Sequence, residues 1–223
     1  LMAAWKIAPA LSAGNTVILK PAETTPLTAL KLAEVIQEAD LPPGAVNIIP
    51  GDGKTGSHIV EHSDIDKIAF TGSTVIGKYI QKSLAGTGKK FTLELGGKAA
   101  NIIFEDAAIN QAVEGIINGI FFNQGHVCCA GSRLLIQEGI SKLVLSKLKN
   151  RMKSLVLGNP LDKNTDIGAI NSKEQLHRIK KYVKSGKDDR CDIYQIQCEI
   201  PQKGFWFRPT LFTDVSQSHK IVR

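Results

Sequence analysis

Short apolar strand patterns alternate with amphipathic helix patterns along the first 97 residues, and this alternation restricts the fold more than any other feature. Strands are expected at Thr16–Leu19 and in "AVNIIPG", "KIAFTGS" and "FTLELGG". Between them, helices are expected from a Thr24 or Thr25 cap with Pro26 as first helical residue, from Thr55 to His62 and from Thr74 to Leu84. Strands separated by helices require right-handed crossovers, so the pattern predicts an α/β fold with a parallel, doubly wound sheet.

A second α/β unit is expected after the glycine pair Gly96-Gly97, where two glycines interrupt two apolar strands. We therefore predict two domains, residues 1–96 and 97–223. The elements expected in the second are the strands "ANIIFED" and "RLLIQEG", helices at 109–122, 140–155 and 173–184, and late strands in "CDIYQIQ" and "FWFRPTLF".

Composition excludes several classes of protein. No apolar run approaches the ~20 residues that cross a bilayer, and no signal-peptide pattern opens the chain. Four cysteines at irregular spacing indicate neither a disulfide framework nor a zinc ribbon, so a cytoplasmic location is expected. The net charge is +7, but acidic residues are mixed among the lysines and arginines, so we expect no nucleic-acid partner. The chain starts inside a helix pattern and stops without a turn or polar tail, which predicts a fragment of a longer protein.

Three short motifs suggest nucleotide or metal sites, and each has a simpler explanation. "GDGKTG" fits G-x-G-x-x-G after a strand, but no acidic residue follows about 20 residues later. "GSTVIGKY" approaches a Walker A loop, yet Tyr79 stands where Ser or Thr must hold magnesium. "HIVEH" could place two histidines on one helix face, but no third zinc ligand is evident, so no metal site is expected.

Two stretches 34 positions apart point to chemistry. "TLELGGK" places Glu94 in an otherwise apolar strand, where burial would raise its pKa and suit it to act as a base. "FFNQGHVCCAGSR" places a thiol at a junction between helix and loop, where backbone amides can lower its pKa and bind an oxyanion. A base and a nucleophile form a functional pair. The simpler alternative for Cys128 is a buried small apolar residue.

With these residues in view, the sequence resembles the aldehyde dehydrogenase superfamily through nearly its whole length. The similar blocks are "AAWKIAPALSAGNTVILKPAETTPLTAL", "LPPGAVNIIPG", "KIAFTGSTVIGK", "LELGGKAANIIF" and "FFNQGHVCCAGSR", in the family's order. The resemblance implies a Rossmann-type cofactor domain and a second α/β catalytic domain, both incomplete here. "GNPLDKNTDIGAINS" and "GFWFRPTLF" are also similar to the family 16 branch, whose members can carry a second, degenerate domain.

The resemblance assigns residue roles in the same order. It implies that Cys128 is the nucleophile and Glu94 the general base, while Cys129 is a neighbour of Cys128 that is usually not essential. His126 stands where the family usually has Gln or Glu. The residues implied to bind NAD are Lys20 and Glu23 at the adenosine ribose, Gly53 under the adenine, Gly72, Ser73 and Gly77 at the pyrophosphate, and Thr71 near the nicotinamide. A carboxylate at the ribose favours NAD over NADP because it repels a 2′-phosphate.

The implied reaction is oxidation of an aldehyde to a carboxylic acid through a cysteine thiohemiacetal and thioester, with Glu94 activating the hydrolytic water. The family also implies a homodimer or homotetramer for the full-length protein. Family blocks expected just before Leu1 and just after Arg223 hold an oxyanion donor and the nicotinamide ribose, so the isolated chain is expected to be nearly inactive. Two alternatives stay open: an inactive scaffold or interaction protein on the same fold, and an acylating enzyme in which coenzyme A replaces water.

Overall fold

The computed structural model describes residues 1–223, and the chain divides into two compact units, Leu1–Gly96 and Gly97–Arg223. The division falls between the two glycines that interrupt the strand patterns. Each unit is described by itself below.

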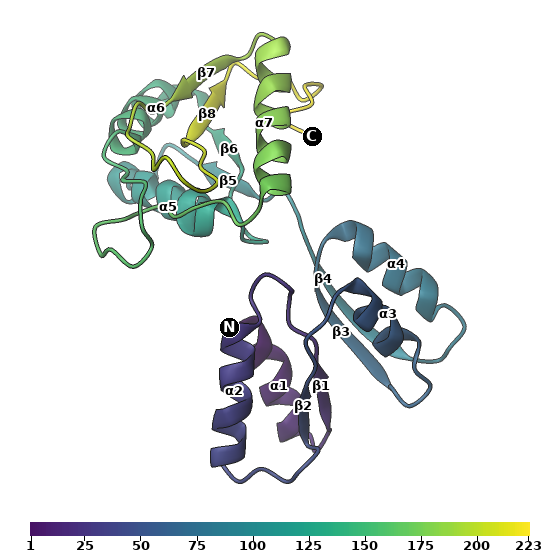
Figure 1. The fold of residues 1–223 in the computed structure, drawn as a ribbon. Coiled ribbons are helices and arrows are strands. Elements are labelled where there is room, and N and C mark those ends of the chain that lie inside the picture. The colour runs from purple at the N-terminus through teal and green to yellow at the C-terminus, as the bar shows by residue number, and fades with distance from the viewer. The chain divides into compact units, whose positions relative to one another are not determined.

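The first unit alternates helices and short strands, as Figure 1 shows. Its elements are α1 (Met2–Ser12), β1 (Val17–Leu19), α2 (Leu27–Glu38), β2 (Val46–Ile48), α3 (Gly53–Glu61), β3 (Lys67–Gly72), α4 (Thr74–Leu84) and β4 (Lys90–Leu95). β1 pairs with β2 and β3 pairs with β4, both in parallel. The α/β class and the parallel pairing are confirmed. No ladder joins β2 to β3, so hydrogen bonds organise the four strands as two pairs and not as one continuous sheet.

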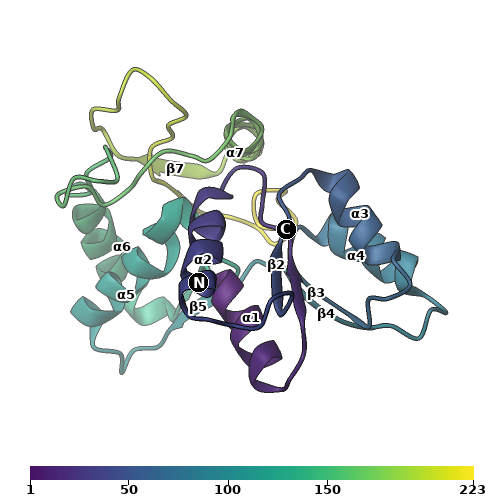
Figure 2. The ribbon, with the colours of Figure 1, turned by 60° about the horizontal axis from the view of Figure 1, so that its bottom comes forward.

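Helices α3 and α4 lie side by side along β3 and β4 in Figures 1 and 2. Their apolar faces close a small core made by Val60, Ile68, Ile80 and Leu84. Two of the helix boundaries follow from side-chain caps, because Asp52 accepts from the amides of the first turn of α3 and Ser73 does the same for α4. These caps fix where each chain segment turns from strand to helix.

The predicted cap of α2 is wrong. The helix begins at Leu27, with Pro26 at the cap position, and neither Thr24 nor Thr25 makes a capping hydrogen bond. Proline has a φ suited to helix entry and no amide hydrogen to satisfy, so this terminus forms without a side-chain acceptor.

The second unit packs helices and short strands around one larger core. Its elements are β5 (Ala100–Ile103), α5 (Ile109–Phe121), the short 3₁₀ turn η1 (Phe122–Gly125), β6 (Arg133–Ile136), α6 (Glu138–Met152), α7 (Lys173–Asp188), β7 (Asp192–Gln195) and β8 (Thr210–Thr213). β5 and β6 pair in parallel, whereas β7 and β8 form an antiparallel pair. Figures 1 and 2 show α5 and α6 lying side by side.

The core of this unit is formed by apolar residues spaced four apart on α6 and by the facing side chains of α5. The buried members on these helices are Val113, Ile116, Ile117, Val144, Leu148 and Met152. A spacing of three and four places such residues on one helix face. This core supports α5 up to the point where the helix ends in η1 and the cysteine pair follows.

Candidate functional site

All cofactor-binding candidates of the first unit follow the carboxyl ends of its parallel strands. Lys20 comes directly after β1, Gly53 opens the helix after β2, and Thr71 and Gly72 end β3. Glu94 is the penultimate residue of β4. In open α/β folds, ligands bind outside the carboxyl ends of the strands, so each of these residues lies at the ligand-binding end of its own strand pair.

Lys20 is held by its surroundings. Its ammonium Nζ donates to the carbonyl of Pro21 at 3.0 Å and to the carbonyl of Gly51 at 2.9 Å, and it lies 3.6 Å from a carboxylate oxygen of Glu23. The Lys20 side chain is 20% exposed and that of Glu23 is 59% exposed. The chain thus fixes the lysine between the ends of β1 and β2 while the Glu23 carboxylate stays open to a ligand.

The glycine-rich turn before α3 does not offer its helix amides to a phosphate. The Asp52 carboxylate accepts from the amides of Lys54 at 2.9 Å and Thr55 at 3.3 Å, so an anionic group of the chain already occupies this terminus. This observation argues against pyrophosphate binding by "GDGKTG". Gly53 is exposed, and nothing lies within 4 Å of a Cβ added to it, so an approaching ligand would meet bare backbone there.

The N-terminus of α4 is more open. Ser73 Oγ accepts from the amide of Ile76 at 3.3 Å, whereas the amides of Thr74 and Val75 have no acceptor within the chain, and both residues are exposed. A Cβ on Gly77, one turn into the helix, would lie 2.5 Å from Leu95 Cδ2, so glycine allows α4 to approach β4 closely. Two free amides at the positive end of a helix suit the binding of an anion.

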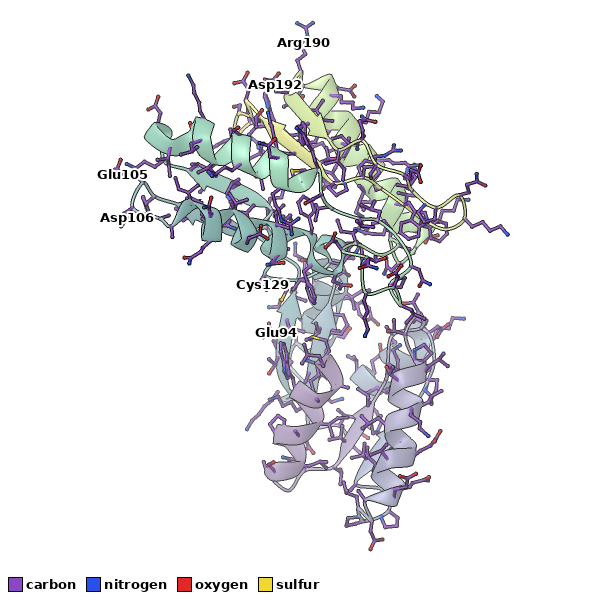
Figure 3. All side chains as sticks on the ribbon, turned by 90° about the vertical axis from the view of Figure 1, so that its left-hand side faces the viewer. Glu94, Glu105, Asp106, Cys129, Arg190 and Asp192 are labelled. Carbon is purple, nitrogen blue, oxygen red and sulfur yellow. The ribbon has the colours of Figure 1, made fainter.

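Glu94 lies beside Thr71, since these two residues are partners in the parallel register of β3 and β4. The prediction that Glu94 is buried is wrong, because its side chain is exposed; Figure 3 shows it at the end of its strand. Leu93 and Leu95 on either side are half-buried, as expected for a strand with one covered face. Glu94 therefore faces the uncovered side, where a water or a ligand can reach its carboxylate.

Two of the polar groups of "HIVEH" already have partners within the chain. His62 Nδ1 already accepts from the amide of Asp64 at 3.2 Å, and the Glu61 carboxylate accepts from the hydroxyls of Ser57 and Tyr79. No group of three or more His, Cys, Asp or Glu residues in the chain is placed to hold a metal ion.

In the second unit, the cysteine pair lies in a tightly folded loop after α5. Asn123, Gln124 and Gly125 have positive φ values of 49°, 56° and 76°, a left-handed run that reverses the chain within one turn. The amide of His126 donates to the Asn123 carbonyl at 2.9 Å, and the Asn123 side chain donates to the His126 carbonyl at 3.2 Å. These bonds close the turn on itself just before the cysteines.

The loop is also tied down after the cysteines. The amide of Ala130 donates to the Val127 carbonyl at 3.0 Å, and the amide of Gly131 donates to the Gly119 carbonyl of α5 at 3.1 Å. Cys128 and Cys129 are free thiols and both are exposed, and Figure 3 shows Cys129 at this loop. The alternative that Cys128 is a buried apolar residue is therefore wrong, since its thiol sits between two anchored turns and is open to solvent.

His126 is half-buried, whereas Cys128 and Cys129, which follow it, are exposed. Desolvation lowers the pKa of the imidazole below its usual value, and the Asn123 backbone hydrogen bond offsets this only in part. Its Nε2 is buried and has no hydrogen-bond partner in the chain. A neutral imidazole is therefore favoured next to the cysteine pair, and one polar atom of the loop is left without an acceptor or donor.

Asn101, in the middle of β5, was missed by sequence reasoning. Its Cβ lies 3.0 Å and its Nδ2 3.3 Å from the position of a Cβ added to Gly131, so this side chain packs against the backbone that follows the cysteines. A side chain at Gly131 would press against Asn101, so glycine suits this contact. The available signal was a polar asparagine within the apolar strand "ANIIF".

Comparison with known proteins adds to this geometry. A family model described as the aldehyde dehydrogenase family matches residues 1–223. An aldehyde dehydrogenase of Davidiella tassiana is 47% identical over 225 residues, which cover 100% of this chain and 45% of that protein. Retinal dehydrogenase 2 of Homo sapiens is 46% identical over 225 residues, covering 100% of this chain and 43% of that protein.

Solved structures agree with the curated relatives. The NAD⁺ complex of an aldehyde dehydrogenase from Bacillus cereus superposes with a TM-score of 0.95 at 42% identity, covering 100% of this chain and 45% of that one. Betaine aldehyde dehydrogenase from Staphylococcus aureus, in complex with NAD⁺, gives a TM-score of 0.93 at 37% identity, with coverages of 99% and 45%. The chain thus spans less than half the length of the relatives it matches. The narrower resemblance to the family 16 branch stays a prediction.

Proposed function

Because the chain belongs to the aldehyde dehydrogenase family, we propose that the protein containing it oxidises an aldehyde to a carboxylic acid with NAD, with Cys128 as nucleophile and Glu94 as base. The observation that carries this proposal is the exposed Cys128 thiol, held in a loop whose backbone is hydrogen-bonded on both sides. A thiol placed in this way can meet a carbonyl carbon without first being uncovered.

The first unit fits NAD at two places. The free amides of Thr74 and Val75, with Ser73 as the helix cap, suit the pyrophosphate, while Gly72 and Gly77 allow the close packing against Phe70 and Leu95 that holds this turn. Lys20 and the exposed Glu23 suit the hydroxyls of the adenosine ribose. In this proposal Gly53 passes under the adenine and Thr71 lies near the nicotinamide. When bound, NAD accepts the hydride that the reaction removes from the substrate.

Cys128 carries the covalent chemistry. Its thiolate attacks the aldehyde carbon and forms a tetrahedral thiohemiacetal, and loss of hydride from that carbon leaves a thioester on the same sulfur. Backbone amides of the anchored loop are the local donors for the developing oxyanion. His126, favoured in its neutral form, does not add a positive charge beside the thiolate.

Glu94 completes the turnover. Its carboxylate is open to solvent at the carboxyl end of β4, so it can accept a proton from a water molecule that attacks the thioester carbonyl. The carboxylic acid then leaves and the Cys128 thiol is restored. A hydrolytic base in this position favours water over coenzyme A as the acceptor.

Two further statements belong to the proposal. All four cysteines are free, which supports a reducing, cytoplasmic location. The full-length protein is proposed to be a homodimer or homotetramer. No helix of the chain is both long and apolar enough to cross a membrane.

The test uses the full-length protein and follows NADH formation from a panel of aliphatic and aromatic aldehydes. Wild type is compared with Cys128→Ala and with the matched variant Cys129→Ala, which removes the adjacent exposed thiol. We expect turnover to be lost in Cys128→Ala and kept in Cys129→Ala. In Glu94→Gln, NADH should form in a single burst because the thioester is no longer hydrolysed. NAD binding without turnover of any aldehyde would instead favour the scaffold alternative.

A further inference from the structure

The strongest feature outside the proposed site is a groove between α7 and the β7–β8 pair. A cavity of about 270 Å³ opens there, lined by Lys180, Val183, Lys184, Lys187, Gln195 and Phe207. The lysines stand on α7, while Gln195 ends β7 and Phe207 precedes β8. Figure 1 shows α7 beside these two strands.

The positive charge of the groove is only partly neutralised. Of the three lysines, Lys184 pairs with Asp188 at 3.0 Å, whereas neither Lys180 nor Lys187 takes part in any ion pair of the chain. Lys187 lies in the last helical turn, where the helix dipole favours a cation. That explanation does not extend to Lys180, which lies in the middle of the helix. Three like charges against one carboxylate leave a net positive rim.

The floor of the groove is apolar and fixed. Val183 and Phe207 are half-buried, and the Gln195 side chain is oriented by its hydrogen bond to Thr210 Oγ1 at 2.8 Å. Gly186 lets α7 approach the strands, since a Cβ there would lie 2.6 Å from Phe212 Cε1. An apolar floor below a cationic rim accommodates an apolar side chain flanked by acidic groups.

The spacing of the lysines selects among anionic ligands. Lys180, Lys184 and Lys187 follow an i, i+4, i+7 pattern along one helix face, so their Cα atoms span about 10 Å along the axis. In an extended peptide alternate side chains face the same side at a repeat of about 6.6 Å, so two or three carboxylates facing the helix cover that distance while a residue between them faces the floor. A single phosphate matches this length less well than a short row of carboxylates.

We propose that the groove between α7 and the β7–β8 pair binds an extended acidic peptide segment, with its carboxylates on Lys180, Lys184 and Lys187 and one apolar side chain over Val183 and Phe207. The site is separate in sequence from Cys128 and Glu94, and the proposal is independent of the oxidation of aldehydes.

The test measures fluorescence anisotropy of the labelled peptide Glu-Asp-Glu-Leu-Glu-Asp-Glu with the full-length protein. The charge-matched variants are Lys180→Gln/Lys187→Gln in the groove and Arg178→Gln/Lys181→Gln on another face of α7. Each pair removes two exposed positive charges from the same helix. We expect the groove variant to raise Kd by roughly three- to tenfold and the other to change it by less than about twofold.

Replacing the leucine of the peptide by glycine should also weaken binding, because the apolar floor then loses its contact. Equal losses in the two variants would overturn the proposal, since they would indicate attraction by net charge alone. An oligothymidylate of equal charge that binds more tightly than the peptide would also overturn it and would indicate a nucleic-acid surface. Absence of peptide binding by wild type at low salt has the same consequence.

Discussion

Truncation of Leu148 to alanine tests whether the core of the second unit supports the cysteine loop. Leu148 is 2% exposed on α6 and lies between Val144 and Met152, which are 0% and 1% exposed. Leu→Ala at such a site removes the transfer free energy of the side chain and leaves a cavity, so the free energy of unfolding should fall by about 3–5 kcal/mol. Leu143, on the same helix, is 48% exposed and supplies a matched control. Because about half of its surface is already in water, Leu143→Ala should cost at most about 1 kcal/mol.

Urea unfolding of the full-length protein gives the measurement, followed by tryptophan fluorescence in a Trp5→Phe background, so that Trp206, which packs against the same core, is reported without Trp5. For a urea dependence of about 1–3 kcal/mol/M, Leu148→Ala should lower the midpoint by about 1 M or more, and Leu143→Ala by at most about half of that. Alkylation of Cys128 should become less selective at urea concentrations where only the Leu148 variant has unfolded. Equal midpoint shifts in the two variants would refute the packing described for α6.

Three further predictions rest on single contacts or ionisations. Gly186→Ala should destabilise the protein by about 1–3 kcal/mol in thermal unfolding, because the Phe212 ring must move to admit a Cβ; an unchanged Tm would contradict the close approach. Burial, aided by nearby carboxylates, raises the pKa of the Cys191 thiol, so peptide mapping after iodoacetamide treatment near neutral pH should find Cys128 labelled and Cys191 protected until unfolding. Burial lowers the pKa of His126 in the folded state, so folding is not opposed by this residue above the unfolded pKa of about 6.5 and loses stability as the pH falls below it. The urea midpoint should therefore fall less on acidification in His126→Gln than in wild type. Identical pH profiles of the two midpoints would disprove this.

Local signals in the sequence predicted much of the secondary structure. The helix Thr74–Leu84 was predicted with both of its bounds, because Ser73 caps it and its apolar residues recur at helical spacing. The helix before the cysteine pair was predicted to within one residue at its end from its apolar spacing alone, because no side chain caps it. α6 begins at Glu138, two residues before the predicted start at Ile140, since the two residues that open it, Glu138 and Gly139, are not apolar.

Pairing of strands could not be derived in the same way. A strand pattern shows which residues are apolar, but it does not show which other strand will be its hydrogen-bonded neighbour. The sequence therefore predicted four parallel strands without the division into β1–β2 and β3–β4. The antiparallel pairing of β7 and β8 likewise depends on the long segment between them folding back, and no two-residue turn marks it.

The position of Glu94 shows why its burial was predicted wrongly and why its candidacy as a base remains. In "TLEL" the side chains alternate across the strand, so Glu94 must face opposite to Leu93 and Leu95. α4 covers the leucine side, where Gly77 allows contact with Leu95. The glutamate thus occupies the uncovered side, in register with Thr71. The alternation that keeps the carboxylate out of the core turns it toward water, and its place near the carboxyl end of β4 agrees with the proposed role as hydrolytic base.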